Sequence, residues 1–166
     1  RDAVLENILD GDELISFRQK RIYRYLEYIL WELSLMPTVY TDLIRDIVNV
    51  MVPDRNYIEF NRTLYYAVRR KVNHILKTDP NISAEHILDL LMEMQSYAKA
   101  YDDIVFSKPG VYRYTVPWFD HVEEDSREWF GSEGVPMAKD FQEYLKEPQF
   151  DKLRNQESFD MLKNNT

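Results

Sequence analysis

The sequence contains no cysteine and only four glycines among its 166 residues. The absence of cysteine excludes disulfides, thiolate metal sites and cysteine nucleophiles, and it favours a reducing compartment. Phosphate-binding loops need closely spaced glycines, because the backbone amides must approach the anion. Neither a GxGxxG nor a GxxxxGK[ST] pattern occurs here, so these two nucleotide-binding loops are excluded.

Long apolar runs are also missing. No run approaches the roughly 18 residues that a membrane-spanning helix needs, so we expect no transmembrane segment. The chain begins at Arg1 without the charged and apolar regions of a signal peptide, and we expect an excised piece of a larger intracellular protein, cytoplasmic or nuclear. With 45% hydrophobic residues and a formal charge of −8, the chain can close one core without disulfides.

A helical period dominates the first two thirds of the chain. Pro37 and Pro53 end the first two helices, because the residue before a proline is pushed out of the helical region. Asp54 and Ser83 are the expected N-caps of the third and fourth helices. Short turns between the helices predict an all-α fold, an antiparallel bundle of four principal helices over residues 1–106. The predicted buried stripe of the first long helix is Ile15, Ile22, Leu26, Ile29 and Leu33.

The pattern changes in residues 107–166. Residues 111–119 are β-branched and aromatic, which predicts an extended strap lying on the bundle, since one isolated strand has nothing to pair with. Residues 117–166 hold 12 acidic and 6 basic residues, against 17 and 15 in residues 1–116. Such a segment cannot by itself offset an ordering cost of roughly 1–2 kcal/mol per residue. We therefore expect the strap and a series of short acidic helices to dock on the bundle or on a partner.

Aromatic residues are the strongest indication of function. The 12 tyrosines offer broad contact area with a polar tip, a combination enriched at interfaces. The first long helix is apolar over more than one face, which is typical of a helix that is central in its bundle or shared with another chain. Rings among the acidic residues of the tail either complete the protein's own core or anchor it on a partner. The predicted partner-binding residues are Tyr23, Tyr28, Trp31, Trp118, Trp129 and Phe130.

Two basic clusters, in the first and third helices, support an alternative. Side by side they would form one cationic face for phosphate, for an acidic peptide or for the chain's own acidic tail. Otherwise they are the solvent-facing sides of two amphipathic helices. The acidic balance argues against a nucleic-acid groove, so nucleic acid or anionic lipid is the less favoured partner. The anion-binding residues of this alternative are Arg21, Arg24, Arg69 and Arg70.

Catalytic and metal-binding patterns are missing. His74, His86 and His121 lack a glutamate three residues before them, so neither HExxH nor paired ExxH spacing is present. We therefore expect no metal, no cofactor and no catalytic residue. The sequence predicts a non-catalytic protein–protein interaction or scaffold domain of a larger assembly, with other protein chains as partners and self-association as one form of it. A phosphate-recognising helical module is one alternative, and an enzyme with His74 or His86 beside a carboxylate in an enclosed pocket is another.

Overall fold

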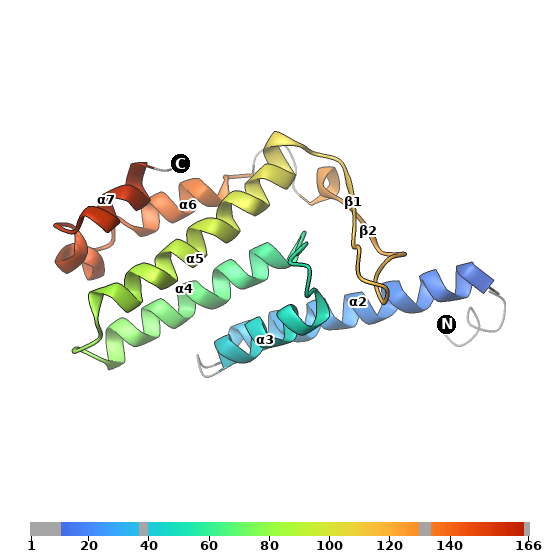
Figure 1. Ribbon diagram of the computed structural model, residues 1–166, viewed down its shortest axis with the longest axis horizontal. Coiled ribbons are helices and arrows are strands. Elements are labelled where there is room, and N and C mark those ends of the chain that lie inside the picture. Colours follow the sequence, from blue (N-terminus) through green and yellow to red (C-terminus); the bar gives the residue numbers. More distant parts are fainter. Residues whose placement is uncertain (1–10, 37–39, 130–133, 165–166) are drawn as a thin grey trace.

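The computed structural model describes residues 11–36, 40–129 and 134–164. These residues are mostly helical, with one small antiparallel sheet of two strands, which confirms the all-α class. Figure 1 shows an elongated arrangement of the elements. Their order is α2 (Gly11–Leu35), α3 (Thr41–Met51), α4 (Phe60–Thr78), α5 (Ala84–Asp102), η2 (Asp103–Ser107), β1 (Val111–Arg113), β2 (Glu123–Asp125), η3 (Ser126–Glu128), α6 (Met137–Tyr144), η4 (Pro148–Leu153) and α7 (Glu157–Asn164).

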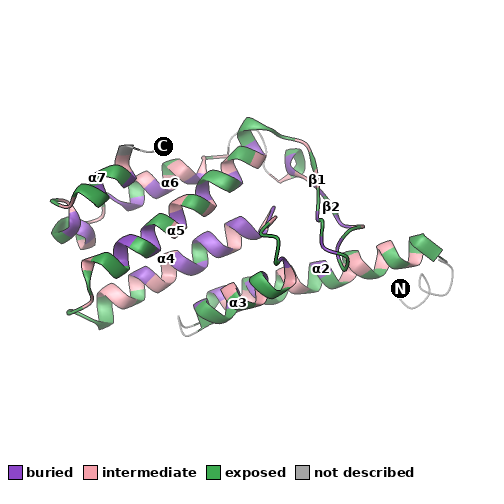
Figure 2. Ribbon diagram, viewed as in Figure 1, coloured by how far each residue is buried: buried purple, intermediate pink, exposed green. Residues whose placement is uncertain are grey.

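Helices α4 and α5 form the centre of the molecule. They lie side by side and run in opposite directions (Figure 1), because a short turn joins them. Ser83 is the N-cap of α5, and its Oγ accepts a hydrogen bond from the backbone amide of His86 at 3.2 Å. The predicted start of this helix is confirmed. The buried residues of α4 and α5 lie on the sides of the two helices that face the core (Figure 2).

The start of α4 differs from the prediction. Asp54 does not cap this helix, which begins at Phe60. Two residues of the connection adopt left-handed backbone angles, Arg55 with φ 61° and Ile58 with φ 47°. Such angles are costly for a β-branched residue, but the side chain of Ile58 is buried, and its burial offsets part of the strain. Asp54 instead accepts hydrogen bonds from the Asn56 amide at 3.2 Å and from the Thr115 hydroxyl.

Two hydrophobic clusters make up the core, on different sides of α4. The first is formed by α2, α3, the segment around the sheet, and Phe60, Leu64 and Ala67 of α4. The second is formed by α5, α6, η4 and α7 with Tyr65, Val68 and Val72 of α4. Both clusters therefore draw on residues before and after position 106, and the packing shows no break at that position.

The segment after position 106 does more than lie on the helices. Strand β1 pairs with β2, with Val111 opposite Asp125, so the expectation of an unpaired strap was wrong. The partner strand lies a short distance further along the chain, and its acidic composition concealed it. Tyr114 and Phe119, from the connection between the strands, are buried in the first cluster, and the rings of α6, η4 and α7 are buried in the second. These rings complete the protein's own core.

Candidate interaction surface

Helix α2 packs on the rest of the protein along one side. Tyr23 and Leu30, seven residues apart, are both fully buried on that side. The Tyr23 ring lies 5.4 Å from Phe60, 5.3 Å from Tyr114 and 5.7 Å from Phe119, measured between ring centroids. The Tyr114 hydroxyl donates to the backbone oxygen of Tyr57 at 3.2 Å and lies 3.3 Å from the Tyr23 hydroxyl. This aromatic cluster determines which side of α2 faces inward.

The buried stripe predicted for this helix is therefore wrong in part: Leu26 and Leu33 pack against the core, but the three isoleucines do not. Ile15, Ile22 and Ile29 are 47%, 54% and 51% exposed, because the aromatic cluster turns them away from the core. Figure 2 shows that α2 is largely exposed or half-buried along its length. We name its exposed large apolar residues the outer face of α2: Ile15, Ile22, Tyr25, Tyr28, Ile29, Trp31 and Leu35.

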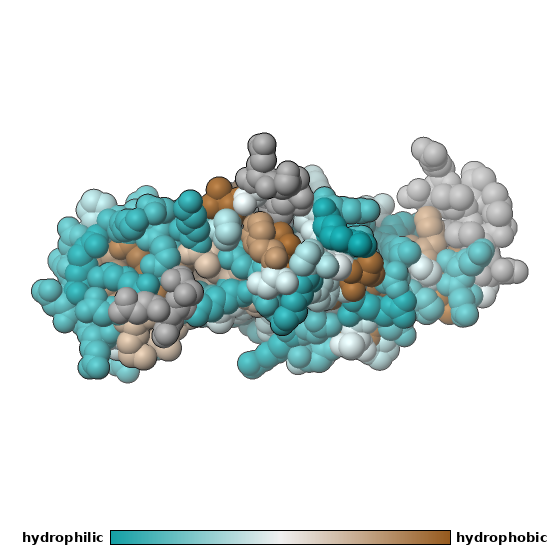
Figure 3. All heavy atoms as spheres, turned by 90° about the horizontal axis from the view of Figure 1, so that it is seen from above, coloured by the Kyte–Doolittle hydropathy of each residue, from teal (hydrophilic) through white to brown (hydrophobic). Residues whose placement is uncertain are grey.

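Apolar exposure is concentrated on this helix. Eighteen large hydrophobic residues are exposed in the part of the chain that the structure describes, and seven of them belong to the outer face of α2. Figure 3 views the molecule from above, over the side opposite α2 in Figure 1, and shows a mainly hydrophilic surface with separate apolar patches. A surface helix normally presents polar residues outward. The outer face of α2 departs from that rule over most of its length.

Opposite charges border the outer face at its two ends. Arg18 lies toward the N-terminal end and Glu32 toward the C-terminal end, and neither forms an ion pair with another described residue. They are 14 positions apart in the sequence, which corresponds to about 21 Å along a helix. Arg21 also lies in the N-terminal half, with its guanidinium 5.9 Å from the Phe17 ring. Helix α2 as a whole has four acidic and four basic residues, so it is neutral.

Three of the predicted partner-binding residues belong to α2. Tyr28 and Trp31 lie on the outer face and are 63% and 44% exposed. Tyr23 has no exposed surface, so its assignment as a contact residue was wrong. Its ring is needed inside, where it contacts three other rings. No sequence signal separates it from Tyr25 and Tyr28, which share its residue type and its helix.

The other three predicted residues lie in the tail. Trp118 is exposed, but its indole nitrogen donates to the carbonyl oxygen of Met51 at 2.7 Å. Trp129 is half-buried and stacks on Tyr101 with ring centroids 5.8 Å apart and planes 11° apart. Phe130 lies outside the described residues. Trp118 and Trp129 are therefore held by intramolecular contacts.

The basic clusters face the acidic residues of the tail. Arg24 pairs with Glu27 at 2.7 Å within α2 and with Glu124 of β2 at 3.2 Å. Arg69 pairs with Asp140 of α6 at 2.6 Å. The two arginines thus bind different parts of the same tail, as the intramolecular alternative expected.

The contacts of the four arginines argue against an anion site. Arg69 also lies over the Tyr144 ring at 4.4 Å, which fixes its guanidinium further. Arg70 is half-buried on α4, and Arg21 lies over a ring of its own helix. Because Arg24 and Arg69 already hold carboxylates, a phosphate would have to displace them. The structure therefore favours an internal role for these two side chains.

A group of carboxylates, of which Glu124 is buried and the others are half-buried, lies beside α2. Glu27 of α2, Glu59 just before α4 and Glu124 of β2 lie together with Arg24 beside them. Burial raises the pKa of Glu59 to about 8, and its hydrogen bond with Glu27 raises it as well. Burial also raises the pKa of Glu124, against the opposing charge of Arg24. Glu59 therefore keeps its proton to a higher pH than an exposed glutamate does. Among the described residues, no group of His, Cys, Asp or Glu could hold a metal ion.

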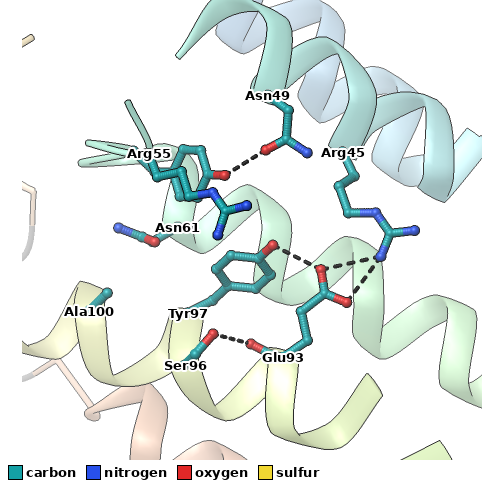
Figure 4. A pocket seen from close by; sticks show the side chains of 9 residues that line it. Arg45, Asn49, Arg55, Asn61, Glu93, Ser96, Tyr97 and Ala100 are labelled. Carbon is teal, nitrogen blue, oxygen red and sulfur yellow. Dashed lines mark hydrogen bonds and ion pairs between the residues drawn. The ribbon is translucent and has the colours of Figure 1, made fainter. Parts of the chain in front are cut away.

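A polar pocket of about 490 Å³ lies between α3, α5 and the loop before α4 (Figure 4). Arg45 donates to both carboxylate oxygens of Glu93, at 3.3 and 3.0 Å. The Tyr97 hydroxyl donates to the same carboxylate at 2.9 Å, and the Tyr57 hydroxyl donates to Asn49 at 2.5 Å. These bonds connect the walls of the pocket to one another. Arg45 and Glu93 neutralise each other, and among the described residues Arg55 is the one charged side chain of the lining without an ion-pair partner.

The histidines do not form the site that the enzyme alternative requires. His74 and His86 are exposed, and His121 is half-buried. His121 Nε2 lies 3.8 Å from the carboxylate of Asp120 at the surface. The structure therefore does not place His74 or His86 in an enclosed pocket beside a carboxylate.

Comparison with known proteins adds no assignment. No family model, no curated protein and no solved structure matches this chain. Within the residues that the structure describes, no helix combines the length and apolarity needed to cross a membrane.

Proposed function

We propose that this protein is a non-catalytic interaction module that binds another polypeptide chain through the outer face of α2. One observation carries the proposal: seven large apolar side chains of a single helix are between 44% and 63% exposed. Aromatic side chains bury about 150–250 Å² each when fully covered. At roughly 25 cal/mol per Å², covering the exposed half of each ring contributes on the order of 2 kcal/mol. The protein's own core leaves this apolar surface exposed to water, and a bound partner would cover it.

The partner surface that fits best is a second amphipathic helix. A helix of 25 residues is about 37 Å long and offers ridges and grooves to a helix lying along it. Recognition by an apolar helical stripe is a common mode of protein–protein binding. The proposed contact is therefore helix on helix, with Tyr25 and Tyr28 near the middle. We also propose that the protein acts inside the cell as part of a larger assembly, in keeping with its lack of cysteine.

The acidic tail has a different role in this proposal. Its rings at Phe141, Phe150 and Phe159 are fully buried in the second hydrophobic cluster. Removing the chain after residue 106 would expose that cluster, so a truncated chain is no clean test of binding. Point substitutions on the outer face are preferable, because the side chains that they change are already exposed.

The experiment is a two-hybrid or affinity screen with the full chain and with the double variant Tyr28→Ser/Ile29→Ser. Met161→Ser serves as the control, because Met161 is 56% exposed on α7, away from α2. We expect partners to be lost with the double variant and kept with the control. Circular dichroism must show that all three chains are equally helical. Partners that bind the double variant as well as the unsubstituted chain would refute the proposal.

Salt separates this function from the phosphate-recognising alternative. An apolar contact tolerates about 0.5 M salt, whereas binding to phosphate through arginines weakens steeply as salt rises. We expect the captured partner to stay bound. Release by salt, together with insensitivity to the outer-face substitutions, would support the phosphate-recognising module instead.

A further inference from the structure

We infer that the chain bound to the outer face of α2 is a second copy of this protein, with the two α2 helices lying antiparallel. The inference rests on the proposed function and names its partner. Its basis is the way in which charge is arranged along the face. Arg18 and Glu32 border the same apolar surface at opposite ends, and neither has an ion-pair partner among the described residues.

The antiparallel direction follows from the positions of these charges. A twofold axis at residue 25 places Arg18 of one copy beside Glu32 of the other, and the reverse pair forms on the far side of the axis. The same axis brings Tyr25 and Tyr28 of both copies together at the centre. A parallel pair would instead place Arg18 against Arg18 and Glu32 against Glu32. The face is thus complementary to itself in one direction only.

The charge of the whole molecule also favours α2 as the contact between copies. The chain carries a formal charge of −8, so two copies repel each other over most of their surfaces. Helix α2 contributes none of that charge, since its four acidic and four basic residues balance. Two copies that meet along α2 therefore approach through a neutral, apolar surface.

The size and position of the face suit a twofold interface. In such an interface the same patch is used on both copies, so one exposed face per molecule is enough. The residues that hold α2 to its own core, Tyr23 and Leu30, lie on the other side of the helix. Two opposed outer faces supply six aromatic rings, from Tyr25, Tyr28 and Trp31 of each copy, each about half exposed. With the aliphatic residues, the buried area approaches the roughly 1,200 Å² of a small stable interface.

The test measures the mass of the full chain by sedimentation equilibrium between about 1 and 100 µM. We expect a dimer, and we expect Arg18→Glu and Glu32→Arg each to weaken it by about tenfold or more, since each reverses two ion pairs per dimer. An equimolar mixture of the two variants should dimerise again, because both ion pairs of the mixed dimer then join opposite charges. The double variant Arg18→Glu/Glu32→Arg should also dimerise. Met161→Ser should leave the dimer unchanged.

Several results would overturn the inference. A chain that stays monomeric at 100 µM has no second copy on this face, and a dimer indifferent to the charge reversals uses another surface. A dimer that is not restored in the mixture does not pair Arg18 with Glu32. A monomer in which radical footprinting finds Tyr28 protected has its outer face covered by another segment of the same chain. If the monomer captures a different protein through Tyr28 and Ile29, the second copy is refuted while the proposed function stands.

Discussion

Substituting Glu59 by glutamine should change how the stability of the protein depends on pH. Glu59 is half-buried beside Glu27, and its pKa is raised to about 8 from 4.5, first by burial and then by the hydrogen bond and charge of Glu27. Arg62 opposes the rise, and Glu124 adds to it. Glutamine keeps the size of the side chain and can still donate to Glu27, but it has no proton to lose. The variant therefore isolates the cost of ionising this one group.

The sign follows from proton linkage. Below about pH 4.5, Glu59 is protonated in both the folded and the unfolded chain, and its contribution to stability is complete. Between about pH 4.5 and pH 8 the unfolded chain loses the proton while the folded chain keeps it, so stability falls as pH rises. One pKa unit is 1.36 kcal/mol, and a rise from 4.5 to about 8 sets an upper bound of about 5 kcal/mol. Because Glu59 shares its proton with Glu27, we expect a loss of about 2 kcal/mol or more.

The assay is urea denaturation followed by circular dichroism at pH 5 and pH 8. We expect Glu59→Gln to match the unsubstituted chain at pH 5 within about 0.5 kcal/mol and to exceed it at pH 8 by about 2 kcal/mol. Glu13→Gln, at an exposed position of α2, should leave the difference between the two pH values unchanged. If Glu59→Gln loses as much stability between pH 5 and pH 8 as the unsubstituted chain does, the reasoning about this carboxylate cluster is wrong.

Four further substitutions test the packing and the helix cap by urea denaturation. Tyr23→Ala should cost about 3–5 kcal/mol of unfolding free energy, since it leaves a cavity among three rings, whereas Tyr25→Ala should cost less than 1 kcal/mol; equal costs would contradict the orientation of α2. Phe150→Ala should likewise cost about 3–5 kcal/mol, because Phe150 is fully buried; a cost below 1 kcal/mol would show that the acidic tail is no part of the core. Ser83→Ala should cost about 1 kcal/mol through loss of the cap on α5, and an unchanged midpoint would mean that water replaces that bond.

Local sequence signals were sufficient where they act on neighbouring residues. Ser83 caps α5 because a hydroxyl oxygen can reach an amide three residues later wherever the rest of the chain lies. The same local logic failed at Asp54. Its carboxylate is drawn to the Asn56 amide and to Thr115, 61 residues further along the chain, and no local pattern reports such a distant donor.

The orientation of α2 left one signal in the sequence. Arg18 is three residues after Ile15 and four before Ile22, and Glu32 is three residues after Ile29. Residues at these spacings share one side of a helix. Charged residues on the side of the predicted buried stripe indicate that this side borders solvent. Tyr23 gave no comparable signal, since only its contacts with the rings of Phe60, Tyr114 and Phe119 place it inside.

The sequence alone determined that the chain is mostly helical and where α5 begins, because periodicity, prolines and caps act within a few residues. It did not determine which side of α2 is buried, since an apolar helix satisfies its own backbone whichever way it is rotated. That choice was made by the tertiary structure, where four rings from distant segments pack together only when Tyr23 points inward. Tertiary packing also decided that the two short strands pair and that the aromatic rings of the acidic tail are buried in the core. Hydrophobic burial has no direction of its own, so the shape of the available partner surface decides which residues are covered.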